Sequence, residues 1–227
     1  MDPLQYPELP RHPSWLDGTV YGALLNYRAD LEALGPRMQT APYLAPPRAP
    51  VLYLKPRNTW IGDGGAVPLP ASASAVHVGA TIALVIGLPC VRIREADAAR
   101  YVAALTVIND LCLPHSEVFR PAIRERCRDG FCAVGPRIAD AAFAQEHVMR
   151  TYIDGKLQGE WSTRDLVRPM ARLLADVSEF MTLHPGDVLM AGTPRTMPLA
   201  HVGARVAVEI DGIGRIENRI VSERAAA

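Results

Sequence analysis

The sequence predicts a β-rich α+β fold for this chain of 227 residues. Its 20 Pro and 17 Gly residues divide it into short segments, which indicates closely spaced turns. The apolar run from Thr81 to Ile86 is typical of a strand that is buried on both faces. Asp-Gly pairs at 154–155 and 211–212 lie between strand-like segments and favour hairpin turns. A chain of this length can form one domain with a substantial core.

The first quarter of the chain is rich in Pro. Residues 1–17 form a Pro-rich head, and Arg37 to Pro50 is a Pro-rich loop that we interpret as a cover or an arm. Val51 to Leu54 is then predicted to be a short strand that delivers Lys55.

Two helices are predicted. From Glu95 to Leu105, apolar residues recur at helical spacing behind an acidic first turn, which predicts a helix that leads into Val107 to Asp110. Ser162 to Asp165 resembles a capping box and is expected to open a second helix that ends at Phe180. Pro169 is tolerated because it lies near the first turns. The second helix has an apolar stripe that we assign to the core: Leu166, Met170, Leu173, Leu174, Val177 and Phe180.

Two hairpins are predicted around the Asp-Gly pairs. Val148 to Ile153 and Lys156 to Gln158 flank the first pair, and Arg205 to Ile210 and Arg215 to Val221 flank the second. Between them, a Pro-Gly-Asp turn precedes a strand over Val188 to Ala191.

Charge and hydropathy exclude several classes of protein. The 24 basic and 24 acidic side chains balance, so we expect neither nucleic acid nor a membrane as a partner. No apolar run approaches the ~20 residues of a membrane-spanning helix. The head lacks the apolar stretch of a signal peptide or anchor. We therefore expect a soluble, cytoplasmic protein.

The cysteines and histidines show no metal-site spacing. The four cysteines form no CxxC pair and are expected to be buried or free thiols: Cys90, Cys112, Cys127 and Cys132. The six histidines are dispersed and are expected at the surface or in turns: His12, His77, His115, His147, His184 and His201. Neither Ser116 nor Ser162 has the surroundings of a nucleophile elbow, so no hydrolase triad is expected.

Five short segments carry a resemblance to a known family. In chain order they are Lys55-Pro56, Val85 to Gly87, Asn109 to Pro114, Arg126 to Pro136 and His184 to Pro194. Together they resemble the fumarylacetoacetate hydrolase superfamily. The similarity is greatest to the amino-terminal half, or its separate subunit, of the isomerase/decarboxylases of 4-hydroxyphenylacetate (homoprotocatechuate) degradation, and Arg120-Pro121 leads into the most specific segment. The resemblance implies the mixed β-roll of that family's catalytic domain over residues 18–221, which leaves the head and the tail 222–227 outside.

The resemblance also implies a metal site. Members of the superfamily hold Mg²⁺ or Mn²⁺ with two glutamates spaced E-x-E on one strand and an aspartate of the Asn-Asp segment. Hard divalent cations prefer such oxygen ligands, and alternate strand positions point to one face. Here the two glutamate positions are Gly79 and Thr81, and of the three ligands only Asp110 remains. We therefore predict no tight divalent site and no cofactor in this chain, and expect Mg²⁺ or Mn²⁺ in a related partner.

The acid/base positions differ as well. The family's His and Glu that follow an Asn-Tyr pair correspond to Asp30 and Ala33. The family's Lys before the Arg-Asp-Gly-Phe segment corresponds to Arg126, which keeps the charge but does not donate a proton near neutral pH. We therefore expect no intact catalytic set.

Four residues remain candidates for a substrate pocket. Lys55, Asp129 and Thr193 match substrate-side positions of the family, and Asp110 is the remaining metal-ligand position. Ordinary structural roles are equally compatible with two of them, because Asp129 precedes a Gly and suits a turn, and Thr193 precedes a Pro and suits a strand end.

Three hypotheses follow. The chain is a subunit of the isomerase/decarboxylase that processes 5-carboxymethyl-2-oxo-hex-3-ene-1,7-dioate, and its pocket contributes to turnover. Alternatively, it is a catalytically silent partner that forms a homo- or heterodimer with a metal-competent relative. A third hypothesis is an independent enzyme with a rebuilt, metal-free site that uses Lys55, Asp110 and Asp129. The small-molecule partner expected for the chain is at most a 2-oxo dicarboxylate substrate.

Overall fold

The described part of the computed structural model, residues 12–115, 122–139 and 143–223, contains two β-sheets. The larger sheet has the order β2-β1-β10-β5-β6-β7-β3, and β11 also pairs with β5. Its strands are β1 (Val20–Leu24), β2 (Val51–Lys55), β3 (Trp60–Ile61), β5 (Val76–Ile86), β6 (Val102–Cys112), β7 (Cys132–Ile138), β10 (Val188–Met190) and β11 (Leu199–Ala200). The smaller sheet has the order β4-β13-β12-β8-β9. Its strands are β4 (Ala66–Leu69), β8 (Val148–Ile153), β9 (Lys156–Ser162), β12 (Arg205–Ile210) and β13 (Gly214–Ser222).

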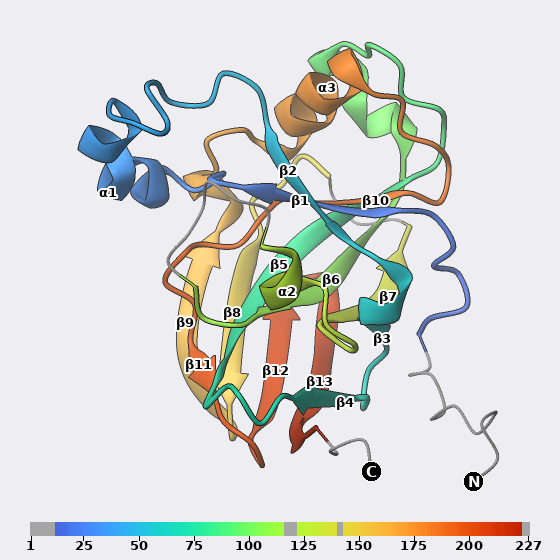
Figure 1. Cartoon of the computed structure of the whole chain (residues 1–227). Coiled ribbons are helices and arrows are strands. Elements are labelled where there is room, and N and C mark those ends of the chain that lie inside the picture. The colour runs from blue at the N-terminus through green and yellow to red at the C-terminus, as the bar shows by residue number, and fades with distance from the viewer. Residues whose placement is uncertain (1–11, 116–121, 140–142, 224–227) are drawn as a thin grey trace, which may run out of the picture.

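The two sheets pack face to face around the main core (Figure 1). Ile82 and Leu84 of β5 contribute to this core together with Val208 of β12. The alternate β5 residues, such as Ala83, face the other way and pack in a second cluster with Trp60. Because successive side chains of a strand point to opposite faces, β5 is buried on both sides, as its apolar run predicted. The β-rich α+β fold is confirmed, with β5 longer than expected.

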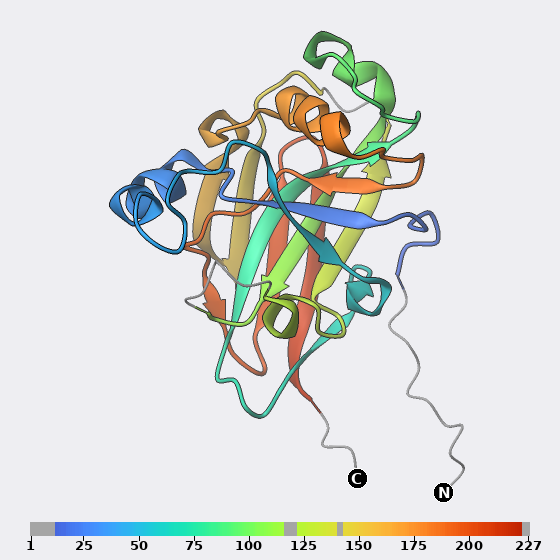
Figure 2. The same ribbon diagram turned by 45° about the horizontal axis from the view of Figure 1, so that its top comes forward.

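The α-helices of the described residues are α1 (Arg28–Met38), α2 (Ile123–Arg126) and α3 (Met170–Phe180), and short 3₁₀ segments cover Arg57–Thr59, Glu95–Tyr101 and Thr163–Asp165. α3 and the 3₁₀ segment Glu95–Tyr101 lie at one end of the sheets, whereas α2 lies in front of the larger sheet (Figure 1 and Figure 2). The sequence analysis did not predict α1, which includes the first residues of the Pro-rich segment. No helix among the described residues is long and apolar enough to cross a membrane.

The first predicted helix is wrong. Its acidic start forms only the 3₁₀ segment Glu95–Tyr101, and β6 begins at Val102. The segment's apolar residues fit a strand as well as a helix, and β6 gains hydrogen-bonded pairing with both β5 and β7.

The second predicted helix begins later than expected. The Ser162 hydroxyl accepts a hydrogen bond from the Arg164 N–H and caps a 3₁₀ turn instead of α3, which follows Pro169. Four of its apolar residues are buried, but Phe180 at its last position is 55% exposed. The assignment of Phe180 to the core is therefore wrong.

Both predicted hairpins are confirmed. β8 and β9 meet at Asp154 and Gly155, whose φ angles of 49° and 76° are those of a type I′ turn. β12 and β13 pair over their lengths and close the smaller sheet. The strand predicted over Val188 to Ala191 is β10. Ser116 and Arg120-Pro121 lie outside the described residues, as do 1–11 of the head and 224–227 of the tail.

Candidate functional site

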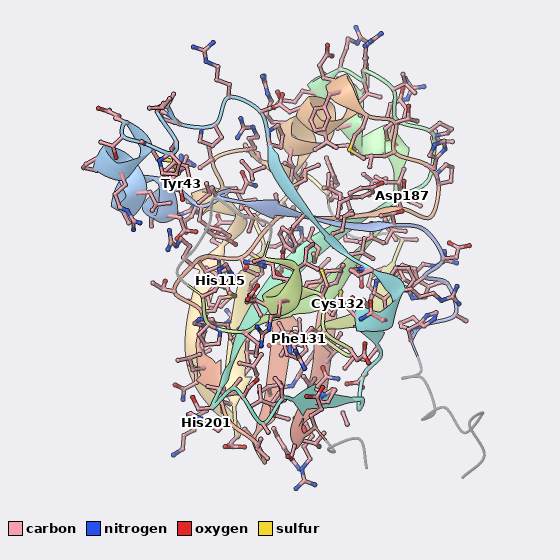
Figure 3. The ribbon with its side chains drawn as sticks, viewed as in Figure 1. Tyr43, His115, Phe131, Cys132, Asp187 and His201 are labelled. Atoms are coloured by element: carbon pink, nitrogen blue, oxygen red, sulfur yellow. The ribbon has the colours of Figure 1, made fainter. Side chains whose placement is uncertain are left out.

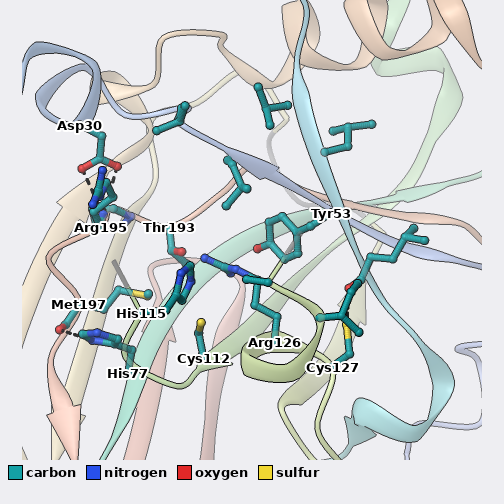
Figure 4. Close-up of a pocket in the computed structure, with 18 residues that line it drawn as sticks. Asp30, Tyr53, His77, Cys112, His115, Arg126, Cys127, Thr193, Arg195 and Met197 are labelled. Atoms are coloured by element: carbon teal, nitrogen blue, oxygen red, sulfur yellow. Dashed lines mark hydrogen bonds between the residues drawn. The ribbon is translucent and has the colours of Figure 1, made fainter. Parts of the chain in front are cut away.

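A cavity of about 410 Å³ lies between β2, α2, the β1–α1 connection and the loop after β10 (Figure 4). One part of its wall is apolar and includes Leu24, Leu52 and Met197. Polar groups line the rest: Asp30, Tyr53, His77, His115, Arg126, Thr193 and Arg195. A volume of this size is in the usual range for small-molecule sites, and so is a mostly apolar wall with a few polar groups.

Asp110, which β6 places in the interior, lies behind the cavity and contacts two of its lining residues, Tyr53 and Arg126. Its Oδ1 atom lies 2.7 Å from Lys55 Nζ, and its Oδ2 atom lies 3.3 Å from Arg126 Nη1. The Tyr53 hydroxyl donates a hydrogen bond to the same Oδ2 atom. Burial alone would raise the pKa of Asp110, but Lys55, Arg126 and the Tyr53 hydrogen bond outweigh burial and lower it. Asp110 is therefore an ionised carboxylate that is paired with two protein cations and accepts a hydrogen bond from Tyr53.

Lys55 joins three segments of the chain. Its buried ammonium donates hydrogen bonds to the carbonyl oxygens of Leu111 at 2.7 Å, Arg126 at 2.9 Å and Phe131 at 2.9 Å, in addition to its ion pair with Asp110. The side chain is completely buried and does not line the cavity. Lys55 therefore binds the protein itself, as an ammonium with all its donors used.

Arg126 separates this buried pair from the cavity. Its guanidinium lies 4.5 Å from the centre of the Tyr53 ring, in cation–π geometry. Burial alone would lower its pKa, but Tyr53 and Asp110 raise it above the ordinary value. Burial and the charge of Asp110 also raise the pKa of Tyr53 well above its ordinary value, so the phenol stays neutral.

The two positions that correspond to the missing glutamates lie beside Asp110. Gly79 is its cross-strand neighbour on β5, so both residues face the same side of the sheet. A Cβ atom on Gly79 would lie 2.5 Å from Met197 Sδ and 2.7 Å from Thr193 Cγ2. Two residues on, the buried Thr81 hydroxyl donates to the Ile82 carbonyl at 3.2 Å.

These residues do not fit a divalent cation. Gly79 has no side-chain ligand, and its neighbours fill the space that a longer side chain would need. Asp110 offers one carboxylate, which two cations already neutralise. A dication would be repelled by those cations, and Mg²⁺ or Ca²⁺ sites require several oxygen ligands. Among the described residues, no group of three His, Cys, Asp or Glu side chains could hold a metal ion.

Asp30 lies at another part of the cavity wall, on α1. Both of its carboxylate oxygens accept the backbone N–H of Arg195 at 3.1 Å. Burial raises the pKa of Asp30, and the Arg195 hydrogen bond and charge offset only part of that effect. Ala33 is exposed and does not line the cavity.

The other candidates divide between the cavity and the surface. Thr193 lines the cavity, so it lies beside Arg126 and Asp30 in one site. Asp129 is exposed, accepts a hydrogen bond from Asn58 Nδ2 at 2.8 Å, and does not line the cavity. The structure thus brings Lys55 and Asp110 together behind the cavity and leaves Asp129 outside.

Two histidines are less exposed than the sequence analysis expected. His77 is on β5, lines the cavity and contacts the Met197 carbonyl at 3.0 Å through Nδ1. Burial lowers the pKa of His77, although the hydrogen bond to Met197 acts to raise it. His147 is buried. The histidines are nevertheless dispersed, since His115 lies near α2 and His201 lies beside β11 (Figure 3).

The sequence analysis missed several cavity residues. Tyr53 could have been found, because it lies two positions before Lys55 on a predicted strand and thus shares its face. Cys112 and Cys127 also line the cavity, and all four cysteines are free thiols, as expected. Burial raises the pKa of Cys112 to about 11, so that side chain is an uncharged thiol at neutral pH.

Residues 19–221 match the family "Fumarylacetoacetate (FAA) hydrolase C-terminal". The chain belongs to this family. It is 41% identical over 209 residues to the 4-hydroxyphenylacetate degradation bifunctional isomerase/decarboxylase of Escherichia coli, a match that covers 92% of this chain and 48% of that protein. The chain therefore spans about half the length of this relative.

Solved structures share the fold. The 5-carboxymethyl-2-hydroxymuconate delta-isomerase of Mycobacterium smegmatis is 30% identical, with a TM-score of 0.79 over 92% of this chain and 81% of that one. The fumarylpyruvate hydrolase of Pseudomonas aeruginosa, in complex with Mn²⁺ and pyruvate, matches at a TM-score of 0.74 over 97% of this chain and 99% of that one, but with 22% identity, which supports the fold alone. The relatives at 30% identity or more thus include an isomerase/decarboxylase and an isomerase.

Proposed function

We propose that this chain is a subunit of the isomerase/decarboxylase of 4-hydroxyphenylacetate catabolism, and that it has no metal site of its own. The reaction in question is decarboxylation of 5-carboxymethyl-2-oxo-hex-3-ene-1,7-dioate together with isomerisation of 2-hydroxyhepta-2,4-diene-1,7-dioate. The similarity to the E. coli isomerase/decarboxylase over half of its length supports the subunit assignment. Metal-dependent steps on a 2-oxo acid would then require a related subunit with an intact carboxylate set.

The observation that carries the metal-free assignment is the environment of Asp110. In a metal site this carboxylate would face the ion together with two others from β5. Here its oxygens bind Lys55, Arg126 and Tyr53, and the neighbouring position, Gly79, has no space for a side chain. Asp110 serves as the counter-ion of two buried cations, which is a structural role.

The same observation favours a second candidate, a catalytically silent partner in a homo- or heterodimer with a metal-competent relative. Asp30 and Ala33 replace the family's acid/base pair, and only Asp30 lines the cavity. A domain that keeps its fold without a complete catalytic set is accounted for if a partner needs its surface. The third hypothesis, an independent metal-free enzyme, has less support because Asp129 lies outside the cavity.

Reconstitution tests these candidates. The purified chain is assayed alone, with Mg²⁺ or Mn²⁺, and after addition of a relative that carries the E-x-E motif. We expect no turnover by the chain alone and turnover on mixing that exceeds that of the relative. Metal-dependent turnover by the chain alone would contradict the metal-free assignment, and an unchanged rate on mixing would contradict a subunit role.

Cavity variants in the mixed assembly separate the two roles. If this cavity contributes to turnover, Thr193→Val lowers the rate, whereas Asp129→Asn, outside the cavity, serves as the matched control. If the chain is a silent partner, both variants leave the rate unchanged and only variants that prevent association lower it.

A further inference from the structure

The buried residues around Asp110 carry an excess positive charge. Lys55 and Arg126 are both cations, and within this group Asp110 is the one carboxylate. The Tyr53 hydroxyl donates its proton in a hydrogen bond to Asp110, so this side chain adds no charge. The group therefore has a formal charge of +1, and Arg126 is its charged member that lines the cavity, together with the neutral Tyr53.

Arg126 also has an unused donor. Its side chain is only 9% exposed, and its Nε–H has no hydrogen-bond partner among the described residues. A buried polar group without a partner is costly, more so when it is charged. Figure 4 shows Arg126 in the wall of the cavity; its Nε atom is itself buried, so a ligand in the cavity meets the exposed remainder of this side chain and not Nε.

We propose, on the basis of the metal-free site proposed above, that this cavity binds a small carboxylate without a metal ion, through Arg126. The guanidinium supplies the positive charge that a divalent cation would otherwise supply, and its planar donors match a carboxylate. The apolar wall formed by Leu24, Leu52 and Met197 contacts the carbon chain of the ligand. An organic carboxylate suits such a wall better than phosphate, which would leave most of its acceptors without donors.

Asp30 limits how the ligand is oriented. It lines the same cavity, and its carboxylate is held by the Arg195 N–H. A ligand carboxylate placed beside Asp30 would be repelled, whereas one placed at Arg126 is attracted. The ligand is therefore expected to bind with its carboxylate toward β2 and α2.

Pyruvate is a suitable probe because its methyl group reports binding in saturation-transfer NMR. The full chain is titrated with pyruvate in EDTA and again with excess Mg²⁺, and methyl pyruvate serves as the uncharged control. We expect saturable pyruvate binding that differs less than about twofold between EDTA and Mg²⁺, and much weaker binding of methyl pyruvate. Inorganic phosphate is added as a competitor and is expected to displace pyruvate poorly.

Variants assign the binding to Arg126. Arg126→Met leaves Lys55 and Asp110 as a balanced pair, so the fold is expected to persist, and pyruvate binding is expected to weaken about tenfold or more. Arg126→Lys keeps the positive charge but lacks the paired planar donors of a guanidinium, so we expect an intermediate affinity. This variant provides a second measurement if the Met variant is unstable. Arg124→Met is the matched control, because Arg124 lies on the same helix and does not line the cavity.

Several results would overturn the proposal. Binding that requires Mg²⁺ or Mn²⁺ would contradict both this proposal and the metal-free site. Equal binding of the wild type and Arg126→Met, tighter binding of phosphate, or no saturable binding of pyruvate would contradict this proposal alone. The subunit role is measured separately by reconstitution, so its failure is distinguishable from the failure of carboxylate binding.

Discussion

The three buried charges predict an order of stability among single variants. Asp110→Asn would leave the ammonium of Lys55 and the guanidinium of Arg126 without a counter-ion. Removal of one partner of a buried ion pair costs about 3–5 kcal/mol, because an uncompensated charge stays in the interior. Here two cations lose their partner, so we expect a loss of free energy of unfolding at or above the upper end of that range.

Arg126→Met has a smaller expected effect. The Lys55–Asp110 pair, at 2.7 Å, remains balanced, and the Tyr53 hydrogen bond to Asp110 remains. The variant loses a longer contact of 3.3 Å and the stacking on Tyr53, but it also removes a cation that is 9% exposed. We expect a cost of about 1–2 kcal/mol, since a hydrogen bond to a charged group contributes about 1.5–3 kcal/mol and relief of desolvation offsets part of it.

Urea unfolding at pH 7 measures both variants, with Asp129→Asn as an exposed control that should change stability by less than about 0.5 kcal/mol. The slope of unfolding free energy against urea should stay constant, so that the midpoints report stability. If Asp110→Asn proved as stable as Arg126→Met, Asp110 could not be the counter-ion of two cations. That result would refute the structural role assigned to this carboxylate.

Three further predictions concern the rest of the site. Gly79→Ala should cost about 1–3 kcal/mol by overpacking against Met197, and Met197→Ala should recover part of that cost in urea unfolding; a neutral Gly79→Ala would contradict the close approach. The pKa of Asp30 is raised, so the folded state holds this proton more tightly than the unfolded state does. The contribution of Asp30 to stability is therefore greatest below its unfolded pKa and falls as pH rises through its folded pKa. Asp30→Asn should remove this contribution to the pH dependence of the urea-unfolding midpoint. Millimolar Mg²⁺ or Mn²⁺ should leave the melting temperature of the chain unchanged. If the chain bound the ion, an ion concentration of 100 times the dissociation constant would stabilise the fold by about 2.7 kcal/mol and raise the melting temperature measurably.

Local turn chemistry explains which parts of the fold could be predicted. Asp154 and Gly155 adopt positive φ angles that few other residue types favour, so the hairpin they close is encoded by two neighbouring residues. The segment from Glu95 was misjudged because acidic residues suit the start of a 3₁₀ turn as well as that of a helix. The residues after it became a strand through pairing with β5 and β7, which no local pattern encodes.

The site was predictable only in part for the same reason. The family resemblance placed Gly79, Thr81 and Asp110 in one site, and β5 and β6 pair there. The contact of Arg126 with Asp110 depends on how α2 packs against the sheets. Sequence alone also indicated Lys55 as a pocket residue, whereas its three carbonyl partners come from segments that converge only in the fold.

The electrostatics of the site suggest why a single reversion would not create a metal site. A glutamate at Gly79 would first have to displace Met197 and Thr193. A divalent ion placed at Asp110 would still face Lys55 and Arg126. The ion and these two side chains carry four positive charges, whereas Asp110 and the added glutamate would carry only two negative charges. Arg126 would have to be replaced as well, because its guanidinium already contacts Oδ2 of Asp110, the carboxylate that would have to bind the metal ion. The cavity is therefore organised for an anion, with protein cations where a metal site would need carboxylates.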